Sequence, residues 1–319
     1  MFDKAPLWIH GGIQHSTETA RAADWLALSG EEGVATATCL KVTALPTPGS
    51  SVRYAPGVAA ILSRFSGASL QTYVGRNPTT DTIAISPTSS AGGRSDLIVV
   101  AVDDFNYVGS TPPNPNSAQL IDVRVIQNVP ADTTSTIGRS TRYPTAVALA
   151  RIDLPPSTAT ITNAMITDLR KIARPRSRAL APIIRNATAG LAISNEGNYF
   201  TFPGNDPMVD IPSWATRATV EARIESVRHV HPATVGHLRV KLGSIVSQHL
   251  RTFDESGLVD GGFDRKELTV TGDFAVPPSM AGTSQRVACE GVRTGGTGYF
   301  ATDSYTRVVY NIRFDEAIQ

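Results

Sequence analysis

The sequence predicts a mainly β protein: an N-terminal β-rich domain with two short helices, followed by a C-terminal antiparallel β-sandwich. Apolar and polar residues alternate over many short segments, as they do in strands with one buried face. Turn-forming residues separate these segments, with 26 Gly and 21 Pro among 319 residues. Only two stretches show helical spacing. A chain of this length suffices for two domains that each bury a core.

The composition excludes several classes of protein. With 41% hydrophobic and 18% charged residues, the chain is globular rather than disordered. A net charge of +1 argues against a general nucleic-acid binder, so we expect no nucleic-acid partner. No window approaches about 20 apolar residues, so we expect no membrane span, and the first residues lack a signal-peptide pattern. Cys39 and Cys289 lie too far apart for a disulfide framework and are expected in the core.

The first helix is predicted over residues 16–30, "STETARAADWLALSG". Ser16 or Thr17 is a suitable N-cap, and Gly30 suits the exit from the helix. One face carries a narrow apolar stripe that must pack on something, made of Ala22, Trp25, Leu26 and Ser29. Further along, residues 97–102 form a continuous apolar run, which predicts a strand covered on both faces.

The second helix is predicted at 164–174 within "ITNAMITDLRKIARPR". Its apolar seam would dock on the first domain through residues spaced i, i+4 and i+7, namely Met165, Leu169 and Ile172. Arg170 falls on the solvated side, among basic residues that a helix C-terminus favours. Pro175 then ends the helix at the preceding residue.

These features divide the chain into three parts. Residues 1–175 form the first domain, and 176–186 form a basic, proline-containing linker without periodicity. Residues 187–319 form the sandwich, because clean alternation recurs there in "ATVEARI", "HLRVKL", "ELTVTGDFAV" and "TRVVYNIRF".

The sequence predicts no enzyme, because it contains no strong catalytic motif. Asp103 and Asp104 are adjacent carboxylates at a strand end, where acidic residues commonly face a loop. The glycines of "GVRTGGTGY" lack the strand-then-helix context of a phosphate-binding loop. We therefore assign no catalytic residue and expect no cofactor.

One group of histidines has ligand-like spacing, in "RHVHPATVGH". His229 and His231 would share one face of a strand, and His237 begins the next strand of the hairpin. Three imidazoles would suit zinc or iron. However, His229 lies an even number of positions from Thr219 and other polar residues of the same strand. Alternation therefore places it on the exposed, polar face. On this basis we predict no metal site and keep the three histidines as candidates.

Four aromatic residues are candidate glycan contacts if they lie at loop tips, because aromatic rings stack on sugars: Trp214, Tyr299, Phe300 and Tyr305. The alternative is ordinary core and edge packing, which explains them without any ligand.

Several segments together resemble a known family. In order, "SGEEGV", "LKVTALPTPGSSVRYAPGVAAIL", "YVGRNPTTDTIAI", "GGRSDLIVVAVDD", "YPTAVALARIDLPPSTATIT" and "AMITDLRKIARP" resemble the N-terminal region of minor tail or upper baseplate proteins of long-tailed bacteriophages, chiefly those of actinobacterial hosts. The resemblance covers about residues 12–175, and "RSDLIVV" and "ITDLRK" carry most of it.

The resemblance implies a structural protein of the virion tail tip, synthesised in the host cytoplasm. Its N-terminal domain would attach to other tail-tip proteins, and its C-terminal domain would reach further tip proteins or host-surface glycan. Trimers are common in such tail-tip fibres, so the resemblance also implies a homotrimer. The alternatives are a carbohydrate-active enzyme that degrades wall glycan and a module that binds glycan without cleaving it.

Overall fold

The computed structural model describes residues 16–108, 114, 118–194, 197–255 and 261–318. Most of the regular structure consists of antiparallel strands, which confirms the mainly β fold class. The chain divides into two compact units, and the division falls between Pro175 and Arg176. Among the described residues, no helix has the length and hydropathy needed to cross a membrane.

Helix α1 (Thr17–Ala27) confirms the first predicted helix, and Ser16 caps it by accepting a hydrogen bond from the Thr19 backbone N–H at 3.0 Å. The predicted apolar stripe is not buried, since no residue of α1 is buried and Leu26 is 72% exposed. Arg21 provides polar contacts that hold the helix. Its Nε donates to Gln71 at 2.6 Å, and its guanidinium lies 4.9 Å from the centroid of the Tyr73 ring.

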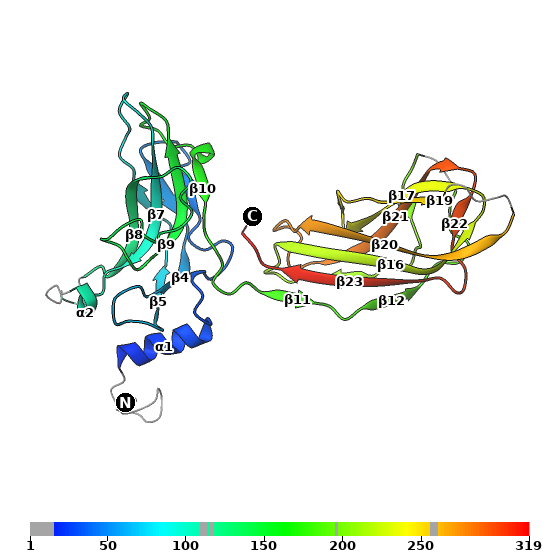
Figure 1. Cartoon of the computed structure of the whole chain (residues 1–319), viewed down its shortest axis with the longest axis horizontal. Helices are drawn as coiled ribbons and strands as arrows, with labels where there is room; N and C mark the ends of the chain where they lie inside the picture. The colour runs from blue at the N-terminus through cyan, green and yellow to red at the C-terminus, as the bar shows by residue number, and fades with distance from the viewer. Residues whose placement is uncertain (1–15, 109–113, 115–117, 195–196, 256–260, 319) are drawn as a thin grey trace. The chain divides into compact units, whose positions relative to one another are not determined.

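The first unit contains three small sheets and the short helix α2 (Phe105–Val108). Their strand orders are β1-β4-β5, β2-β3-β6 and β10-β9-β7-β8, and the last of these can be followed in Figure 1. The strands are β1 (Gly33–Val34), β2 (Val42–Ala44), β3 (Ser51–Tyr54), β4 (Gly57–Leu62), β5 (Thr72–Asn77), β6 (Asp81–Ala84), β7 (Arg94–Val102), β8 (Ile121–Val129), β9 (Ala146–Leu154) and β10 (Ile166–Asp168).

Strand β7 is the centre of this unit. Its residues from Ser95 to Val102 are all buried, so the prediction of a strand covered on both faces is confirmed. Ile98 and Val100 pack into the larger of two apolar clusters, and Leu97 and Val99 pack into the smaller one. Successive side chains of a strand point to opposite faces, so this one strand joins both cores.

The predicted helix at 164–174 is wrong. The segment makes one 3₁₀ turn (Asn163–Met165) and then extends as β10, which pairs with β9. Beyond β10 the backbone N–H of Leu169 donates to the Leu149 carbonyl, and Ile172 forms a parallel bridge with Val34. Hydrogen bonding to neighbouring strands outweighs the local helical spacing.

The three seam residues are partly buried, but they do not share one face. Met165 and Ile172 pack against the larger cluster, whereas Leu169 packs against the smaller one. Alternation along a regular strand does not explain this distribution, because none of the three residues lies in β10 and Met165 and Leu169, four positions apart, pack against different clusters. Their helical spacing therefore arises in an irregular segment that contacts both cores.

Arg170 was predicted on a solvated face, and this is also wrong because its side chain is only 1% exposed. Its Nη2 lies 2.7 Å from Oδ2 of Asp168, and its Nε donates to Oδ1 of Asp168 at 2.9 Å. Its Nη1 donates to the carbonyl oxygens of Ala37 at 2.9 Å and Cys39 at 2.6 Å. The buried guanidinium thereby finds the partners that its burial requires.

The second unit is the predicted antiparallel β-sandwich. Its larger sheet contains β11 (Ser177–Ala179), β12 (Ile183–Asn186), β13 (Ala192–Ile193), β16 (Arg217–Val230), β20 (Phe263–Ala275), β22 (Tyr299–Ala301) and β23 (Arg307–Asp315). Its other sheet contains β14 (Phe200–Thr201), β15 (Met208–Asp210), β17 (Thr234–Leu242), β18 (Ile245–Val246), β19 (Arg251–Glu255) and β21 (Ser284–Gly296).

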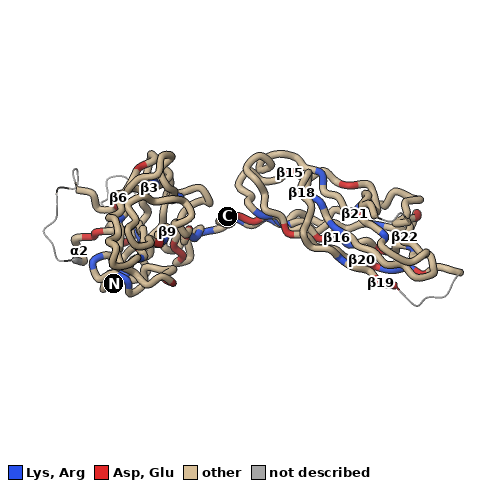
Figure 2. Tube along the Cα trace, turned by 90° about the horizontal axis from the view of Figure 1, so that it is seen from above, with Lys and Arg blue, Asp and Glu red and all other residues tan. Residues whose placement is uncertain are grey.

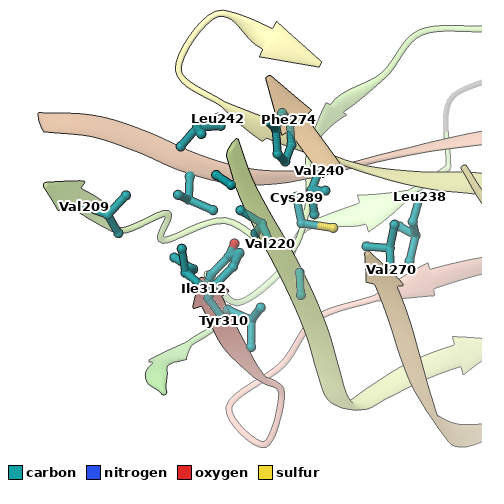
Figure 3. Packing of buried hydrophobic residues seen from close by; sticks show 14 of the residues in the cluster. Val209, Val220, Leu238, Val240, Leu242, Val270, Phe274, Cys289, Tyr310 and Ile312 are labelled. Atoms are coloured by element: carbon teal, nitrogen blue, oxygen red, sulfur yellow. The ribbon is translucent and has the colours of Figure 1, made fainter. Parts of the chain in front are cut away.

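Inward-facing residues of both sheets form one apolar core (Figure 3). Val220 and Tyr310 come from the larger sheet, and Leu238, Val240 and Cys289 come from the other. Outside this core, basic and acidic residues are interspersed along the strands (Figure 2), and several form ion pairs such as Arg239 with Glu290. The alternation seen in the sequence thus separates the core from the charged surface.

The linker predicted at 176–186 is also corrected, because most of it belongs to the sandwich. Strands β11 and β12 both pair with β23. Arg176 precedes them and donates from Nε and Nη2 to the carboxylate of Glu316 at 2.7 and 2.8 Å. The basic residues Arg178 and Arg185 are exposed on these two strands at an edge of the sheet, and Arg176 is held by Glu316.

Arg170→Ala should lower the free energy of unfolding of the first unit by about 3 kcal/mol, because Asp168 and two carbonyl groups lose a buried cationic partner. Lys171→Ala is the matched control, since the Lys171 side chain is exposed and only its backbone carbonyl is used. This variant should stay within about 0.5 kcal/mol of the original protein. Urea unfolding followed by circular dichroism measures both, and equal losses would contradict the role given to Arg170.

Candidate functional site

Two of the histidine candidates, His229 and His231, lie where β16 ends, just beyond a β-bulge, and His237 lies on β17. The register between β16 and β20 shifts between Ile224 and Val227, and Ser226 adopts a positive φ of 55°. A bulge inserts one extra residue and exchanges the faces to which later side chains point. His229 therefore points into the sandwich and is 0% exposed, so the prediction of an exposed polar face is wrong.

Two of the three histidines come together with an aspartate. Nδ1 of His229 lies 3.2 Å from Oδ1 of Asp264, and Nε2 of His231 lies 3.4 Å from the same oxygen. One ligand atom from each of these residues lies within 4.8 Å of the others. His237 does not join them, because its Nδ1 contacts the Thr252 hydroxyl at 3.2 Å.

Asp264 was missed by the sequence analysis. It is the direct partner of His229 in the pairing of β16 with β20, although 35 positions along the chain separate the two residues. No local signal identifies this pairing, because it depends on the register between two strands that are distant in sequence.

Burial dominates the electrostatics of His229. Desolvation lowers the pKa of its imidazole below the ordinary value, although Asp264 and Glu255 oppose this shift. Partial burial acts to raise the pKa of Asp264, but Lys266, whose Nζ lies 3.1 Å from Oδ2, and the two histidines together hold it below the ordinary value. The group therefore combines a neutral buried imidazole with an ionised carboxylate.

Aromatic rings fix the orientation of His229. The centroid of its ring lies 4.8 Å from that of Phe300, which in turn packs edge-on against Phe253 at 4.8 Å. Phe300 is 0% exposed. It is a core residue, so its selection as a glycan contact is wrong.

The other aromatic candidates are not gathered at one site. Trp214 is partly buried against the core, with the Arg176 guanidinium 5.3 Å from its ring centroid. Tyr299 is partly buried on β22. Tyr305 is 72% exposed and lies under the guanidinium of Arg265, 5.1 Å from its ring centroid. Of the four, Tyr305 has the exposure that a glycan contact needs.

A second exposed ring, which the sequence analysis missed, accompanies Tyr305. Phe263 is 52% exposed, and the Arg228 guanidinium lies 4.2 Å from its ring centroid. Arg228 is the direct partner of Arg265 in the pairing of β16 with β20, so their side chains lie on the same face of the sheet. Phe263 lies two residues before Arg265 on β20 and therefore shares this face. We call Arg228, Phe263, Arg265 and Tyr305 the arginine–aromatic face.

The adjacent carboxylates near the end of β7 are not arranged as a catalytic pair. Asp104 is buried, and its Oδ2 accepts a hydrogen bond from Tyr73 at 2.8 Å. Its Oδ1 accepts from the backbone N–H of Asn106 at 2.9 Å. Asp104 thereby ties β5 to the turn at α2, which is a structural task.

Comparisons with known proteins give little. No protein-family model matches the chain, and no curated protein matches it. The solved structures similar to it include the VP2 subviral particle of infectious bursal disease virus, with 13% identity, a TM-score of 0.22, and coverage of 90% of this chain and 75% of that chain.

Two further solved structures are similar at the same low level. One is a viral particle of IBDV, with 13% identity, a TM-score of 0.24, and coverage of 91% of this chain and 70% of that chain. The other is the Cry4Aa toxin from Bacillus thuringiensis, with 10% identity, a TM-score of 0.19, and coverage of 90% and 52%. At these TM-scores the similarities carry no inference about this chain.

A buried carboxylate inside the sandwich responds to pH in a defined direction. The side chain of Asp206 is 0% exposed, its Oδ2 lies 2.9 Å from Nη2 of Arg286, and the Tyr310 hydroxyl donates to its Oδ1 at 3.4 Å. Burial raises the pKa of Asp206 above its ordinary value, although Arg286 and Tyr310 oppose the shift. The folded state therefore binds this proton more tightly than the unfolded chain does.

The stabilisation that protonation of Asp206 contributes is full below the unfolded pKa of 3.8 and is lost as pH rises through the higher folded pKa. The original protein should therefore lose stability between about pH 3 and about pH 7, whereas Asp206→Asn has no such carboxylate to ionise. The free energy of unfolding of the variant should rise relative to that of the original protein over this range. Urea unfolding at both pH values measures this difference. Arg286→Met should enlarge the loss of stability that the original protein shows as pH rises. A difference in unfolding free energy between Asp206→Asn and the original protein that does not change with pH would contradict the raised pKa of Asp206.

Proposed function

We propose that the chain is a structural subunit of the virion, located in the tail tip or baseplate of a long-tailed bacteriophage. The observation that carries the proposal is the ordered resemblance over about residues 12–175, strongest in "RSDLIVV" and "ITDLRK". In this chain these two segments form the central strand β7 and the strand and turn around Arg170. The first unit would attach to neighbouring tail-tip proteins.

The architecture suits a structural task. Each unit has its own apolar core, and the buried carboxylate near β7 is engaged in holding the fold. A carbohydrate-active enzyme, the alternative from a different class, needs two convergent carboxylates or an activated nucleophile. Asp104 is not available for such a role, because both of its oxygens accept hydrogen bonds within the first unit.

We further propose that the subunit forms a homotrimer, with α1 contributing to the contacts between copies. The apolar residues of α1 are not buried in a single chain, and Leu26 is 72% exposed. Closed rings of identical subunits match the rotational symmetry of a tail tip. Residues 12–15, which precede this helix, lie outside the described residues, and the helix predicted at 164–174 does not form, so the proposed contact rests on α1.

A second candidate function, binding of host-surface glycan without cleavage, is favoured by the arginine–aromatic face. Exposed rings backed by guanidinium groups offer both stacking surfaces and hydrogen-bond donors, the groups that recognise sugars. This function is compatible with a structural role, because the second unit would present the face while the first unit attaches.

The location is tested on virions. Immunogold labelling with an antibody against the chain should mark one end of the tail, and mass spectrometry of purified particles should detect the chain. Label on the head, or absence of the chain from purified particles, would overturn the tail-tip proposal.

The trimer is tested by analytical ultracentrifugation at micromolar concentration, which should give a species of about three times the chain mass of 33.9 kDa. Leu26→Arg should shift the population toward the monomer, because it places charge in an apolar contact. A single species at the chain mass, unchanged on concentration, would contradict the trimer.

Glycan binding is tested by retention on purified host-wall material. Phe263→Ala with Tyr305→Ala should weaken retention by about tenfold or more, because exposed aromatic anchors carry much of the energy of such contacts. Met208→Ala is the matched control, since Met208 is 60% exposed on β15 and not part of the face. Release of soluble sugar would favour the enzyme, and equal retention by all variants would contradict binding at this face.

A further inference from the structure

One ring nitrogen of His229 has a hydrogen-bond partner among the described residues, and the other has none. Nε2 of His229 lies 3.1 Å from the Thr234 hydroxyl, which donates to the Pro232 carbonyl at 3.4 Å and so can accept from Nε2. In that arrangement Nε2 carries the proton of the neutral ring, and Nδ1 presents a lone pair. Among the described residues, this buried Nδ1 has no hydrogen-bond partner.

That lone pair points toward another acceptor. Nδ1 of His229 lies 3.2 Å from Oδ1 of Asp264, and the same oxygen accepts a hydrogen bond from Nε2 of His231 at 3.4 Å. With the lone pair of Nδ1 facing the carboxylate, a cation between them replaces repulsion with attraction, and it would take the place of the proton on Nε2 of His231. Three donor atoms from different side chains therefore converge on a small volume that favours a cation.

We propose that His229, His231 and Asp264 bind a divalent transition-metal cation, with Zn²⁺ as the best match. Ligand atoms around tetrahedral zinc lie about 2.1 Å from the metal and hence roughly 3.4 Å from one another. Both distances from Asp264 Oδ1 agree with this spacing. Imidazole nitrogens with one carboxylate oxygen form a common zinc ligand set, and three protein ligands leave a fourth position for water.

The surroundings support the ligands. The hydrogen bond from His229 to Thr234 fixes the tautomer, as outer groups around metal sites commonly do. Lys266 binds the second oxygen of Asp264 and also Glu255, each at 3.1 Å. Two carboxylates and one ammonium leave a net charge of −1, which attracts a divalent cation. His231 and Asp264 are 17% and 41% exposed, so an ion can enter from solvent.

Isothermal titration of chelator-treated protein with ZnCl₂ tests the proposal directly. The protein should bind one equivalent, and Zn²⁺ should raise its melting temperature because the ion binds only the folded site. Titration with Co²⁺ should give the intense visible absorption of a tetrahedral complex. These titrations use the original protein, so they remain informative even if a substituted protein fails to fold.

Variants then assign the ligands. His231→Ala and Asp264→Asn should each weaken zinc binding by about 100-fold, and Thr234→Val by about 10-fold through the outer hydrogen bond. His237→Ala is the matched control, since this histidine follows closely in the chain and lies outside the cluster, and it should bind as the original protein does. Absence of binding, or equal losses in the control and ligand variants, would overturn the proposal.

Discussion

The buried guanidinium of Arg170 is the interaction on which the first unit depends. It joins the turn after β10 to the carbonyl groups of Ala37 and Cys39, while the adjacent backbone pairs with Val34 of β1. Just before β10, Asn163 accepts a hydrogen bond from the backbone N–H of Ala44 on β2 at 2.8 Å. One short segment thus contacts all three sheets. A glycine is required beside it, because a Cβ on Gly33, at φ 144°, would lie 2.1 Å from the Lys171 carbonyl oxygen.

In the sandwich, the comparable constraint is the bulge of β16. Before it, residues such as Val220 and Ile224 face the core, and after it Val227 and His229 do. Without the extra residue His229 would face solvent and Arg228 the core. The bulge therefore creates both the histidine–aspartate cluster on the inner side and the arginine–aromatic face on the outer side.

The sequence predicts those parts of the fold that a local pattern determines. Alternation identified β16, β17, β20 and β23 of the sandwich, and the apolar run identified β7, because burial of one or both faces of a strand determines the pattern of consecutive residues. The pattern failed at Met165, Leu169 and Ile172, whose helical spacing arises instead in an irregular segment that contacts two cores. It failed at His229 because one bulge reverses the face, and it missed Asp264 because pairing between distant strands leaves no local signal.

The histidine–aspartate cluster and the arginine–aromatic face are connected through the backbone of β16 and β20. His229 and Asp264 are direct partners in the β16–β20 ladder, and the pair next to them is Arg228 with Arg265. A cation held by the inner pair would also fix the backbone from which the outer arginines project. A surface that is already ordered loses less entropy when it binds, so an occupied cluster would preorganise the arginine–aromatic face for its ligand. Zinc and surface binding would then strengthen each other, since coupling between two sites is reciprocal.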